Sequence, residues 1–489
     1  MKQAYLFLIG FIFIPILGCR ASSEANSKPQ DSPNFLLQSE GKEIPVKQYK
    51  TYYYAHFECT SEQSLSLGSL EQIKEFEISP VSYGVNGKLD GNTLHFTISH
   101  PGYYMIRINR THRVFIFADE IQKPEFSMIS VSDYDIDATG NKLETAKLQA
   151  ILDKTSGSGK VLHFPPGIYK TGLLRIRSNT NIHLDMGAII KGPDNISDLV
   201  TKENIRPRSF ILIKDAENVK ITGRGIIDAN GRYLRDHFGD EGRCRVLLVL
   251  NSSNISIDGI FLCDPGSWNT QILHSEDVVI RHVKVLNDIH LSNTDGINPD
   301  ASRRVLIDNC FAYCSDDNIA VKSTNTMNYL QDVEDITVSN CVFLTKKSAL
   351  KVGTESNAGS MKNITFENND VLECDRGMSL YCYDGANYEN IRFINNRFEK
   401  NYPDRNQCYF HFRIRQRNEN SRIGIMKKVL IKDCSFLTAF PNPSSVEGFD
   451  PMHNIELVIE NLTIDGVKCT NVNEDIFLQH NNADISYKE

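Results

Sequence analysis

The 489-residue sequence has no basic stretch that offsets its acidic charge, no apolar run long enough to cross a bilayer and no CxxC pair. A net charge of −8 that no basic cluster offsets argues against nucleic acid as a partner. Because the sequence has neither a CxxC pair nor a His/Cys cluster, we expect no metal and no cofactor. The hydrophobic content of 40% is sufficient for a sizeable core, and the length suggests two domains or one repetitive domain with an accessory.

The sequence contains twelve cysteines, but their placement does not suggest disulfides. Cys310, Cys341 and Cys434 each follow an Asn or Asp directly and precede an apolar or small residue. Free cysteine behaves as a small apolar residue in protein cores. The recurrence therefore predicts a stacked column of buried thiols.

The first 45 residues have the composition of a targeting segment rather than of a folded domain. After a short positive start, residues 6–17 form an apolar run that ends in a small residue before Cys19. Residues 1–19 resemble a bacterial lipoprotein signal with Cys19 as the lipidated residue; an ordinary N-terminal membrane anchor is the alternative. Residues 20–45 are predicted to be a flexible tether. We expect a monomer, lipid-anchored in the bacterial cell envelope at the outer membrane or facing the periplasm.

Residues 46–123 alternate apolar and polar residues in short segments separated by Asn-Gly, Asp-Gly and Pro-Gly turns. This spacing predicts an antiparallel β-sandwich of about eight strands. Tyr52, Tyr53 and Tyr54 admit two interpretations: a carbohydrate-binding surface, or strand residues of a domain that covers its neighbour. The junction at residues 121–127 is short and has a proline but no glycine, so we expect the two domains to pack together.

Residues 126–489 repeat a segment of apolar, polar and apolar residues followed by a small or amide residue, at intervals of roughly 20 to 40 residues. The segments begin at Val219, Ile255, Val278, Val305, Ile336, Ile364, Ile391, Val429 and Leu462. This period is typical of stacked coils, and a helical spacing of the apolar positions is absent. The predicted fold class is therefore all-β: a right-handed parallel β-helix preceded by a β-sandwich.

Two further features of this region support stacked coils. Asn309, Asn340, Asn368 and Asn395 recur at the turn position, which predicts a ladder of amides bonded from coil to coil. Residues 144–154 have the pattern of an amphipathic helix, with Ala146, Leu148, Ile151 and Leu152 as its apolar positions. We expect this helix to cover the end of the stack, where sheet edges would otherwise be exposed.

Residues 292–323 carry three aspartates within one repeat length: Asp295, Asp316 and Asp317. The alternating segment 305–311 between them has a strand pattern. Coils that stack like neighbouring strands, about 4.8 Å apart, would bring the three carboxylates to one cleft. Acids that close cannot all ionise freely. At least one should have a raised pKa and suit a general acid, while the others activate a water.

The motif at residues 293–296, Asn-Thr-Asp-Gly, and the segment 315–323, Ser-Asp-Asp-Asn-Ile-Ala-Val-Lys-Ser, resemble the NTDG and GDDCIAIKS signatures of glycoside hydrolase family 28, the polygalacturonases. Residues 223–231 and 265–269 resemble two further segments of that family. The resemblance implies inverting hydrolysis, with Asp316 as the general acid and with Asp295 and Asp317 positioning and deprotonating water. The candidate substrate-binding residues are Asn293, Lys322, Lys351, Arg376, Tyr381 and Trp268.

Several of these candidates carry further expectations. Lys322 and Lys351 should lie near the aspartates on the following coils. Trp268, the one tryptophan, is interpreted as a platform for sugar stacking or as a core aromatic.

The sequence departs from family 28 in two places. Where the family has Gly-His-Gly, this chain has Lys347, Ser348 and Ala349, and where the family has Arg-Ile-Lys, residues 376–381 read Arg-Gly-Met-Ser-Leu-Tyr. Hydroxyl groups can bond sugar hydroxyls but cannot neutralise a carboxylate. We therefore expect a neutral or only locally acidic sugar at the cleaved position. Cations that could substitute are Lys351, Arg376, Arg413, Arg415 and Arg417.

Three other functions stay open. The order of sandwich and β-helix also resembles family 49, the dextranases and isopullulanases, which implies hydrolysis of a neutral α-glucan. A polysaccharide lyase on the same fold would need carboxylate-bound Ca²⁺ and a basic residue. A non-catalytic carbohydrate-binding β-helix is the third, because a fold alone does not imply activity.

Overall fold

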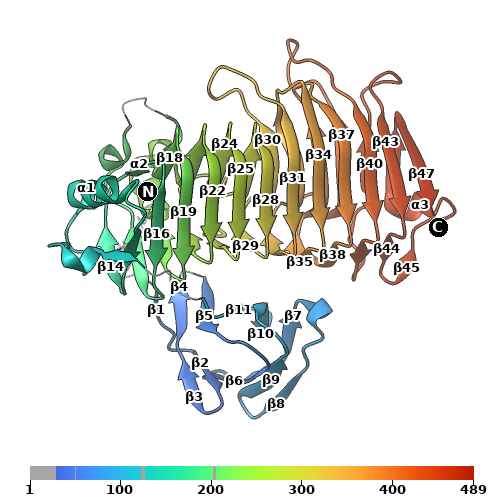
Figure 1. Cartoon of the computed structure of the whole chain (residues 1–489). Helices are drawn as coiled ribbons and strands as arrows, with labels where there is room; N and C mark the ends of the chain where they lie inside the picture. The colour runs from blue at the N-terminus through green and yellow to red at the C-terminus, as the bar shows by residue number, and fades with distance from the viewer. Residues whose placement is uncertain (1–28, 50, 123–126, 202–204, 489) are drawn as a thin grey trace, which may run out of the picture.

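The computed structural model describes residues 29–49, 51–122, 127–201 and 205–488, which form a parallel β-helix and a β-sandwich lying beneath its middle coils (Figure 1). The predicted signal segment with Cys19, and the start of the tether, lie outside the described residues. Among the helices in the described ranges, none is long and apolar enough to cross a membrane.

The sandwich consists of two sheets. The six-stranded sheet contains, in order, β1 (Gln30–Asp31), β4 (Val46–Tyr49), β5 (Tyr52–Glu58), β11 (His112–Asp119), β10 (Gly102–Ile108) and β7 (Phe76–Ser79). The five-stranded sheet contains β3 (Lys42–Ile44), β2 (Phe35–Ser39), β6 (Gln63–Ser69), β9 (Thr93–Ile98) and β8 (Gly87–Asp90). All pairs are antiparallel except β5 with β11, which is parallel.

The predicted tether over residues 20–45 is wrong for its second half, because β1, β2 and β3 belong to the sandwich. Phe35 and Leu37 are buried in the sandwich core. They lie on β2, which pairs with β6, where Leu65 and Leu67 are also buried. The polar composition of this segment led to the prediction of a tether, but the pairing of β2 with β6 buries its two apolar residues.

The β-helix has three parallel sheets. The 13-stranded sheet contains β12 (Met128–Ser130), β13 (Val161–Phe164), β16 (Thr180–Leu184), β19 (Glu217–Gly223), β22 (Ser253–Asp258), β25 (Glu276–Arg281), β28 (Arg303–Asp308), β31 (Val333–Ser339), β34 (Ser360–Glu367), β37 (Asn387–Ile394), β40 (Met426–Lys432), β43 (Ile455–Glu460) and β47 (Ala483–Lys488). The 12-stranded sheet contains β14 (Gly167–Lys170), β17 (Ala188–Lys191), β20 (Ile226–Asp228), β23 (Phe261–Cys263), β26 (Lys284–Leu286), β29 (Phe311–Cys314), β32 (Val342–Thr345), β35 (Asp370–Cys374), β38 (Arg397–Asn401), β41 (Ser435–Phe436), β44 (Thr463–Ile464) and the antiparallel β45 (Val467–Lys468).

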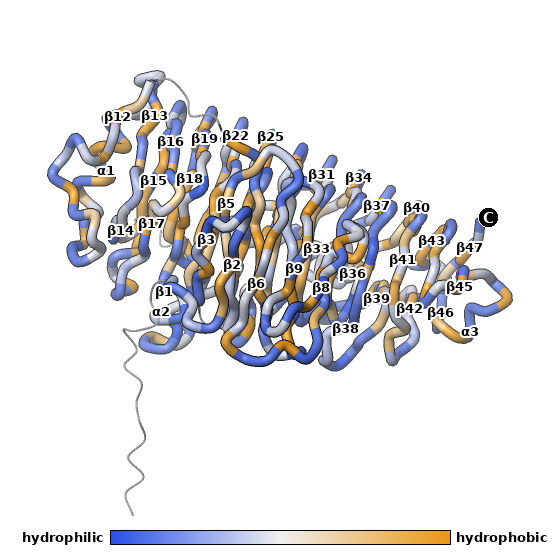
Figure 2. Tube along the Cα trace, turned by 90° about the horizontal axis from the view of Figure 1, so that it is seen from below, coloured by the Kyte–Doolittle hydropathy of each residue, from blue (hydrophilic) through white to orange (hydrophobic). Residues whose placement is uncertain are grey.

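The 11-stranded sheet contains β15 (Leu174–Ile176), β18 (Arg208–Lys214), β21 (Cys244–Leu250), β24 (Thr270–Leu273), β27 (Ile297–Asp300), β30 (Ile319–Ser323), β33 (Ser348–Ser356), β36 (Arg376–Cys382), β39 (Cys408–Ile414), β42 (Ser444–Glu447) and β46 (Leu478–Asn481). Each coil contributes one strand to each sheet, and apolar side chains from all three fill the interior. The hydropathy of the chain accordingly alternates along the coils (Figure 2). The predicted parallel β-helix is confirmed.

Helix α1 (Thr145–Thr155) lies at the first end of the stack, as predicted, with Leu148, Ile151 and Leu152 buried against the coils (Figure 1). Ala146, predicted to be an apolar contact of this helix, is exposed instead. The other α-helices in the described residues are α2 (Gly231–Phe238) and α3 (Glu474–Phe477).

The predicted amide ladder is present from Asn340 onward. The side chain of Asn395 donates to Asn368 over 3.2 Å, Asn368 donates to Asn340 over 2.5 Å, and Asn340 donates to Asp308 over 2.7 Å. These asparagines have φ near +50 to +56°, a left-handed conformation that asparagine tolerates well.

The predicted cysteine column is mixed rather than continuous. Cys310 donates its backbone N–H to the sulfur of Cys341, but two buried amides, Asn369 and Asn396, stand between Cys341 and Cys434. A thiol and an amide can therefore occupy the same interior position. The described cysteines are all free and all buried.

The sandwich packs on the 12-stranded sheet through an aromatic cluster, so the expected docking of the two domains is seen. Phe115 and Phe117 of β11 contact Phe311 of β29 at ring-centroid distances of 5.1 Å. Tyr52 and Tyr54 lie in the same cluster and Tyr53 lies in the sandwich core, with 1%, 7% and 5% of their surfaces exposed. These rings have no free face for a sugar, and the carbohydrate-binding interpretation of the three tyrosines is wrong.

A buried ion pair links the two domains at this interface. Lys284 of β26 has no exposed surface and donates to Asp119, the last residue of β11, over 2.6 Å. Its ammonium also donates to the carbonyl oxygens of Gly259 and His282, and His56 bonds the same Asp119 oxygen over 2.7 Å. Such satisfied contacts are what allow charges to persist in a low-dielectric interior.

Candidate active site

The three predicted aspartates come together at the N-terminal ends of two neighbouring strands in the 11-stranded sheet. Asp295 lies in the turn before β27, and Asp316 and Asp317 lie in the turn before β30, the next strand of that sheet. Asp295 and Asp317 are each 2% exposed, and Asp316 is more open to solvent. The two turns are hydrogen-bonded to each other, because the backbone N–H of Gly296 donates to the carbonyl oxygen of Asp317 over 2.8 Å, and this contact brings the three aspartates to one site.

The turns that carry these aspartates are held by buried polar groups. Asn287 donates its amide to the carbonyl oxygens of Thr294 and Asp295 at 2.8 and 3.1 Å. Asn318 donates to two carbonyl groups on neighbouring strands. Gly296 is required here because a Cβ would lie 2.3 Å from the carbonyl oxygen of Asn318. The two coils therefore approach closely where the carboxylates meet.

The three carboxyl groups have different protonation. Burial, together with the charges of Asp295 and Asp317, raises the pKa of Asp316 to about 7. Burial alone would raise the pKa of Asp317, but Lys351 and Lys322 outweigh it and hold this pKa below its usual value. Burial raises the pKa of Asp295 despite the nearby charge of Lys322. Near neutral pH, Asp316 can therefore carry a proton while Asp317 is ionised.

The two predicted lysines hold the two buried aspartates. Lys351 of β33 donates to Asp317 over 2.6 Å, and Lys322 of β30 lies 3.3 Å from Asp295. Lys322 also pairs with Glu355 at 3.2 Å. Although burial alone would lower it, Asp295 and Glu355 raise the pKa of Lys322 well above its usual value. Each lysine is thus paired with at least one carboxylate of the protein.

Trp268 and Asn293 line the same region, Trp268 from the loop before β24 and Asn293 from the loop that also carries Asp295. The ammonium of Lys322 lies 4.3 Å from the centroid of the Trp268 ring, which is half-buried. The ring is therefore part of the site rather than of the core. Asn293 accepts a hydrogen bond from Arg243 over 2.9 Å, which fixes its side chain at the rim.

Arg376 and Tyr381 lie on β36, two strands beyond the aspartate pair. Arg376 donates to the hydroxyl of Ser348 over 2.9 Å and pairs with Asp375 at 3.0 Å. The hydroxyl of Ser348 is 2.9 Å from that of Ser379, and both serines are fully buried. The ring of Tyr381 lies under the ammonium of Lys351, 5.3 Å from its centroid.

Two residues of this site were not predicted from the sequence. His411 of β39 is paired in register with Ser379, and its Nδ1 lies 2.6 Å from the Tyr381 hydroxyl. Burial and the charge of Arg413 lower the pKa of His411 to about 3, so this histidine is neutral. Glu355 is the second. Aligning β39 with β36 as successive repeats could have found His411, because both belong to the same sheet.

Within the described residues, no three or more His, Cys, Asp and Glu side chains converge in a way that could hold a metal ion. The site is instead an arrangement of three carboxyl groups with two lysines, an arginine and aromatic rings. This arrangement can donate one proton and accept another, and its rim can bond sugar hydroxyls.

The sequence pattern of "Glycosyl hydrolases family 28" matches residues 160–401. This stretch includes all three aspartates and both lysines. It forms a family 28 domain.

Known relatives agree with this placement. A "Probable polygalacturonase" of Vitis vinifera is 29% identical over 215 residues, which are 40% of this chain and 44% of that protein. The chain thus spans about half the length of the curated relatives it matches. The crystal structure of an exopolygalacturonase from Thermotoga maritima aligns with a TM-score of 0.61 at 20% identity, over 74% of this chain and 92% of that one. Dex49A from Penicillium minioluteum aligns with a TM-score of 0.61 at 12% identity, over 94% and 95%. At these identities, each of the two solved structures shows only that it shares its fold with this chain.

Proposed function

We propose that the protein is a polygalacturonase-like glycoside hydrolase that cleaves O-glycosidic bonds of a pectic polysaccharide. The observation that carries the proposal is the pair of neighbouring aspartates in a family 28 domain, one with a pKa of about 7 and one held ionised by lysines. Family 28 relatives named as polygalacturonases supply the substrate class.

In this mechanism Asp316 protonates the glycosidic oxygen of the leaving sugar. Its raised pKa keeps a proton available near neutral pH, and its greater exposure leaves it accessible to substrate. Asp317 and Asp295 orient a water and accept its proton, so that the water attacks the anomeric carbon directly and inverts its configuration. Lys351 and Lys322 keep these two carboxyl groups in place through their ion pairs.

The groups beside the cleaved position favour a neutral or only locally acidic sugar there. Ser348, Ser379 and Tyr381 bring no charge to this place, and their buried hydroxyl groups bond each other and His411. Lys322 and Lys351 already pair with carboxylates of the protein. An uninterrupted chain of uronates would bring additional negative charge that these groups cannot pair.

A screen of purified protein against pectic oligosaccharides and neutral α-glucans tests this proposal. We expect products from the pectic chains, fastest from chains that mix acidic and neutral sugars, with inverted anomeric configuration by NMR. The control is the Asp316→Asn protein in the same assay. Cleavage of α-glucan alone would overturn the pectic assignment in favour of a family 49-like activity, and an unsaturated product would indicate a lyase. Equal or faster cleavage of uninterrupted polygalacturonate would refute the preference at the cleaved position.

We also propose that the protein acts as a lipid-anchored monomer in the bacterial cell envelope. The support is the sequence alone: an apolar run over residues 6–17 that ends just before Cys19. Expressed in a bacterium, the Cys19→Ala protein should move from the membrane pellet to the soluble fraction, with Cys59→Ala as the control. Retention of Cys19→Ala in the pellet would support an ordinary N-terminal anchor instead.

A further inference from the structure

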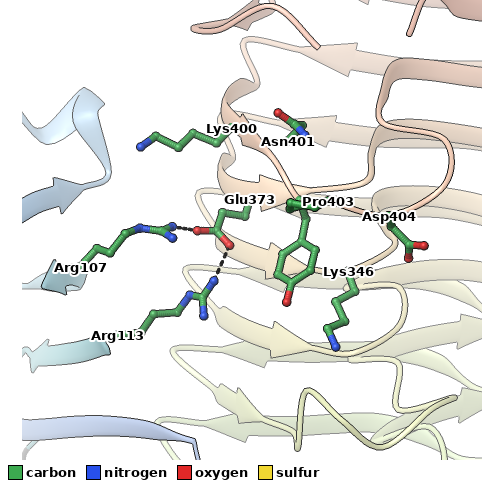
Figure 3. A pocket seen from close by; sticks show the side chains of 9 residues that line it. Arg107, Arg113, Lys346, Glu373, Lys400, Asn401, Pro403 and Asp404 are labelled. Atoms are coloured by element: carbon green, nitrogen blue, oxygen red, sulfur yellow. Dashed lines mark hydrogen bonds and ion pairs between the residues drawn. The ribbon is translucent and has the colours of Figure 1, made fainter. Parts of the chain in front are cut away.

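A cavity of about 730 Å³ lies between the sandwich and the β-helix (Figure 3). It is lined by Arg107, Arg113, Lys346, Glu373, Lys400, Asn401, Tyr402, Pro403 and Asp404. Its volume is within the range of small-molecule and sugar-binding sites in proteins, about 300–1,000 Å³. Both domains contribute to its walls: the two arginines come from the sandwich and the other residues from the β-helix.

Arg107 and Arg113 lie so close together that their like charges need a nearby anion. Arg107 and Arg113 are directly opposite each other in the antiparallel pair of β10 and β11. Like charges in this position destabilise a sheet. Both guanidinium groups contact Glu373, and Arg113 does so at 2.9 Å (Figure 3). Arg107 also lies 3.3 Å from Glu77 of the sandwich.

Lys346 adds a further positive charge to the cavity. In the described part of the chain no carboxylate lies within ion-pair distance of its ammonium, which is instead 5.8 Å from the centroid of the Tyr402 ring. Lys400 pairs at 2.5 Å with Glu77, the carboxylate that Arg107 also contacts. Glu77 and Glu373 together therefore balance three cations, Arg107, Arg113 and Lys400, and one positive charge remains. Asp404 pairs with Lys347, outside the cavity lining. The cavity thus presents more positive than negative charge, in a protein whose net charge is −8.

Residues on either side of Lys346 in the chain contact the turn that carries Asp316 and Asp317. Thr345, which precedes Lys346, donates its hydroxyl to the carbonyl oxygen of Asp316. Ser348, two residues after Lys346, donates its backbone N–H to the Asp317 carboxylate over 3.1 Å. Lys346 of the cavity lining therefore lies on the turn that bonds the two neighbouring aspartates.

We propose that this cavity is a distal subsite that binds the carboxylate of a uronic acid residue in the glycan chain cleaved at Asp316. The inference rests on the proposed function and deepens it. Lys346 and the outer edges of the two arginines pair with the carboxylate. Tyr402 and Pro403 offer an apolar face to the sugar ring. The sandwich then takes part in recognition through its arginines and not through its tyrosines.

Binding to a catalytically inactive background tests the subsite directly. In the Asp316→Asn protein, we expect α-1,4-linked galacturonate oligomers to bind more tightly by calorimetry as they lengthen from two to six residues. Adding Lys346→Gln should weaken hexamer binding about tenfold, the size of one charge-assisted contact, and should affect the dimer less. Lys346→Arg should restore the affinity. Lys362→Gln, which removes a positive charge from β34 outside the cavity, should bind like the parent.

The outcomes separate this inference from the proposed function. Equal hexamer affinity with and without Lys346→Gln, or an equal loss with Lys362→Gln, would overturn the subsite. Oligomers methyl-esterified at their carboxyl groups should bind independently of Lys346, and a Lys346-dependent loss for them would also overturn it. If the unsubstituted protein cleaves no pectic oligomer while hexamer binding still depends on Lys346, the proposed function fails and the subsite stands.

Discussion

Replacing Asp316 with asparagine is expected to lower kcat on the cleaved pectic oligosaccharide by about 10²–10⁴-fold, the usual contribution of a general acid. Asparagine has the same shape and can still accept the backbone N–H of Asp317, which Asp316 accepts over 3.0 Å. The fold should therefore be retained, while the proton for the leaving oxygen is lost. Steady-state kinetics with circular dichroism of the folded protein would measure both.

The pH dependence provides a second readout of the same group. Activity of the parent should fall as pH rises through about 7, where Asp316 loses its proton. Asp317, with its pKa held low by lysines, should stay ionised down to acidic pH. In Asp316→Asn the loss of activity near pH 7 should disappear from the residual rate.

The matched control is Asp335→Asn on β31. Asp335 is exposed and accepts from Asn363 in a ladder where asparagine also occurs, so this change should leave kcat unaltered. A parent-like kcat for Asp316→Asn would contradict the assignment of the acid and favour a non-catalytic, carbohydrate-binding protein.

Replacing Lys284 with methionine is expected to lower the free energy of unfolding by about 3–5 kcal/mol, as when one partner of a buried ion pair is removed. The change withdraws the donor from Asp119 and from the carbonyl groups of Gly259 and His282. Urea denaturation would measure the loss. Limited proteolysis should release the sandwich more readily, because Asp119 and Lys284 belong to different domains.

The stability difference should depend on pH with a defined sign. Burial alone would raise the pKa of Asp119, but Lys284 and His56 lower it below its usual value. A lowered pKa stabilises the folded state above the unfolded value of about 3.9, and this contribution is lost as pH falls further. The difference in free energy of unfolding between the parent and the Lys284→Met protein should therefore become smaller in acid. Lys428→Met, which breaks an exposed pair with Glu389, should change little. A comparable loss in both variants would contradict the role of the buried pair.

The sequence was sufficient to predict the β-helix because its signal is local and repeated. Val305 and Ile307 point inward from β28, and the same alternation recurs in the neighbouring strands of that sheet. The first strands of the sandwich gave no such signal. Phe35 and Leu37 are isolated apolar residues in a polar segment, and only the pairing of β2 with β6 buries them.

The aspartates could be located from the sequence because one repeat separates them, whereas the rest of the site depends on exact coil register. A β-bulge shifts the pairing of β30 with β33 between Val321 and Ser323, and Glu355 then reaches Lys322. The insertion of a bulge has no reliable sequence signal. The cavity between the domains depends on how the sandwich packs on the β-helix. The repeat pattern of the sequence carries no information about that packing.

The buried thiols have a consequence for biosynthesis. Thiolate is the form that reacts in disulfide exchange, and burial raises the pKa of Cys244, Cys408 and Cys469 to about 12. These thiols therefore react little in the folded protein, but a nascent chain exposes them to oxidation. In an oxidising compartment, collapse of the coils must outpace random cross-linking, because a single wrong bridge would prevent two coils from stacking. The yield of active protein then depends on the rate of folding relative to the rate of disulfide formation. Added reductant or slower secretion would change this yield.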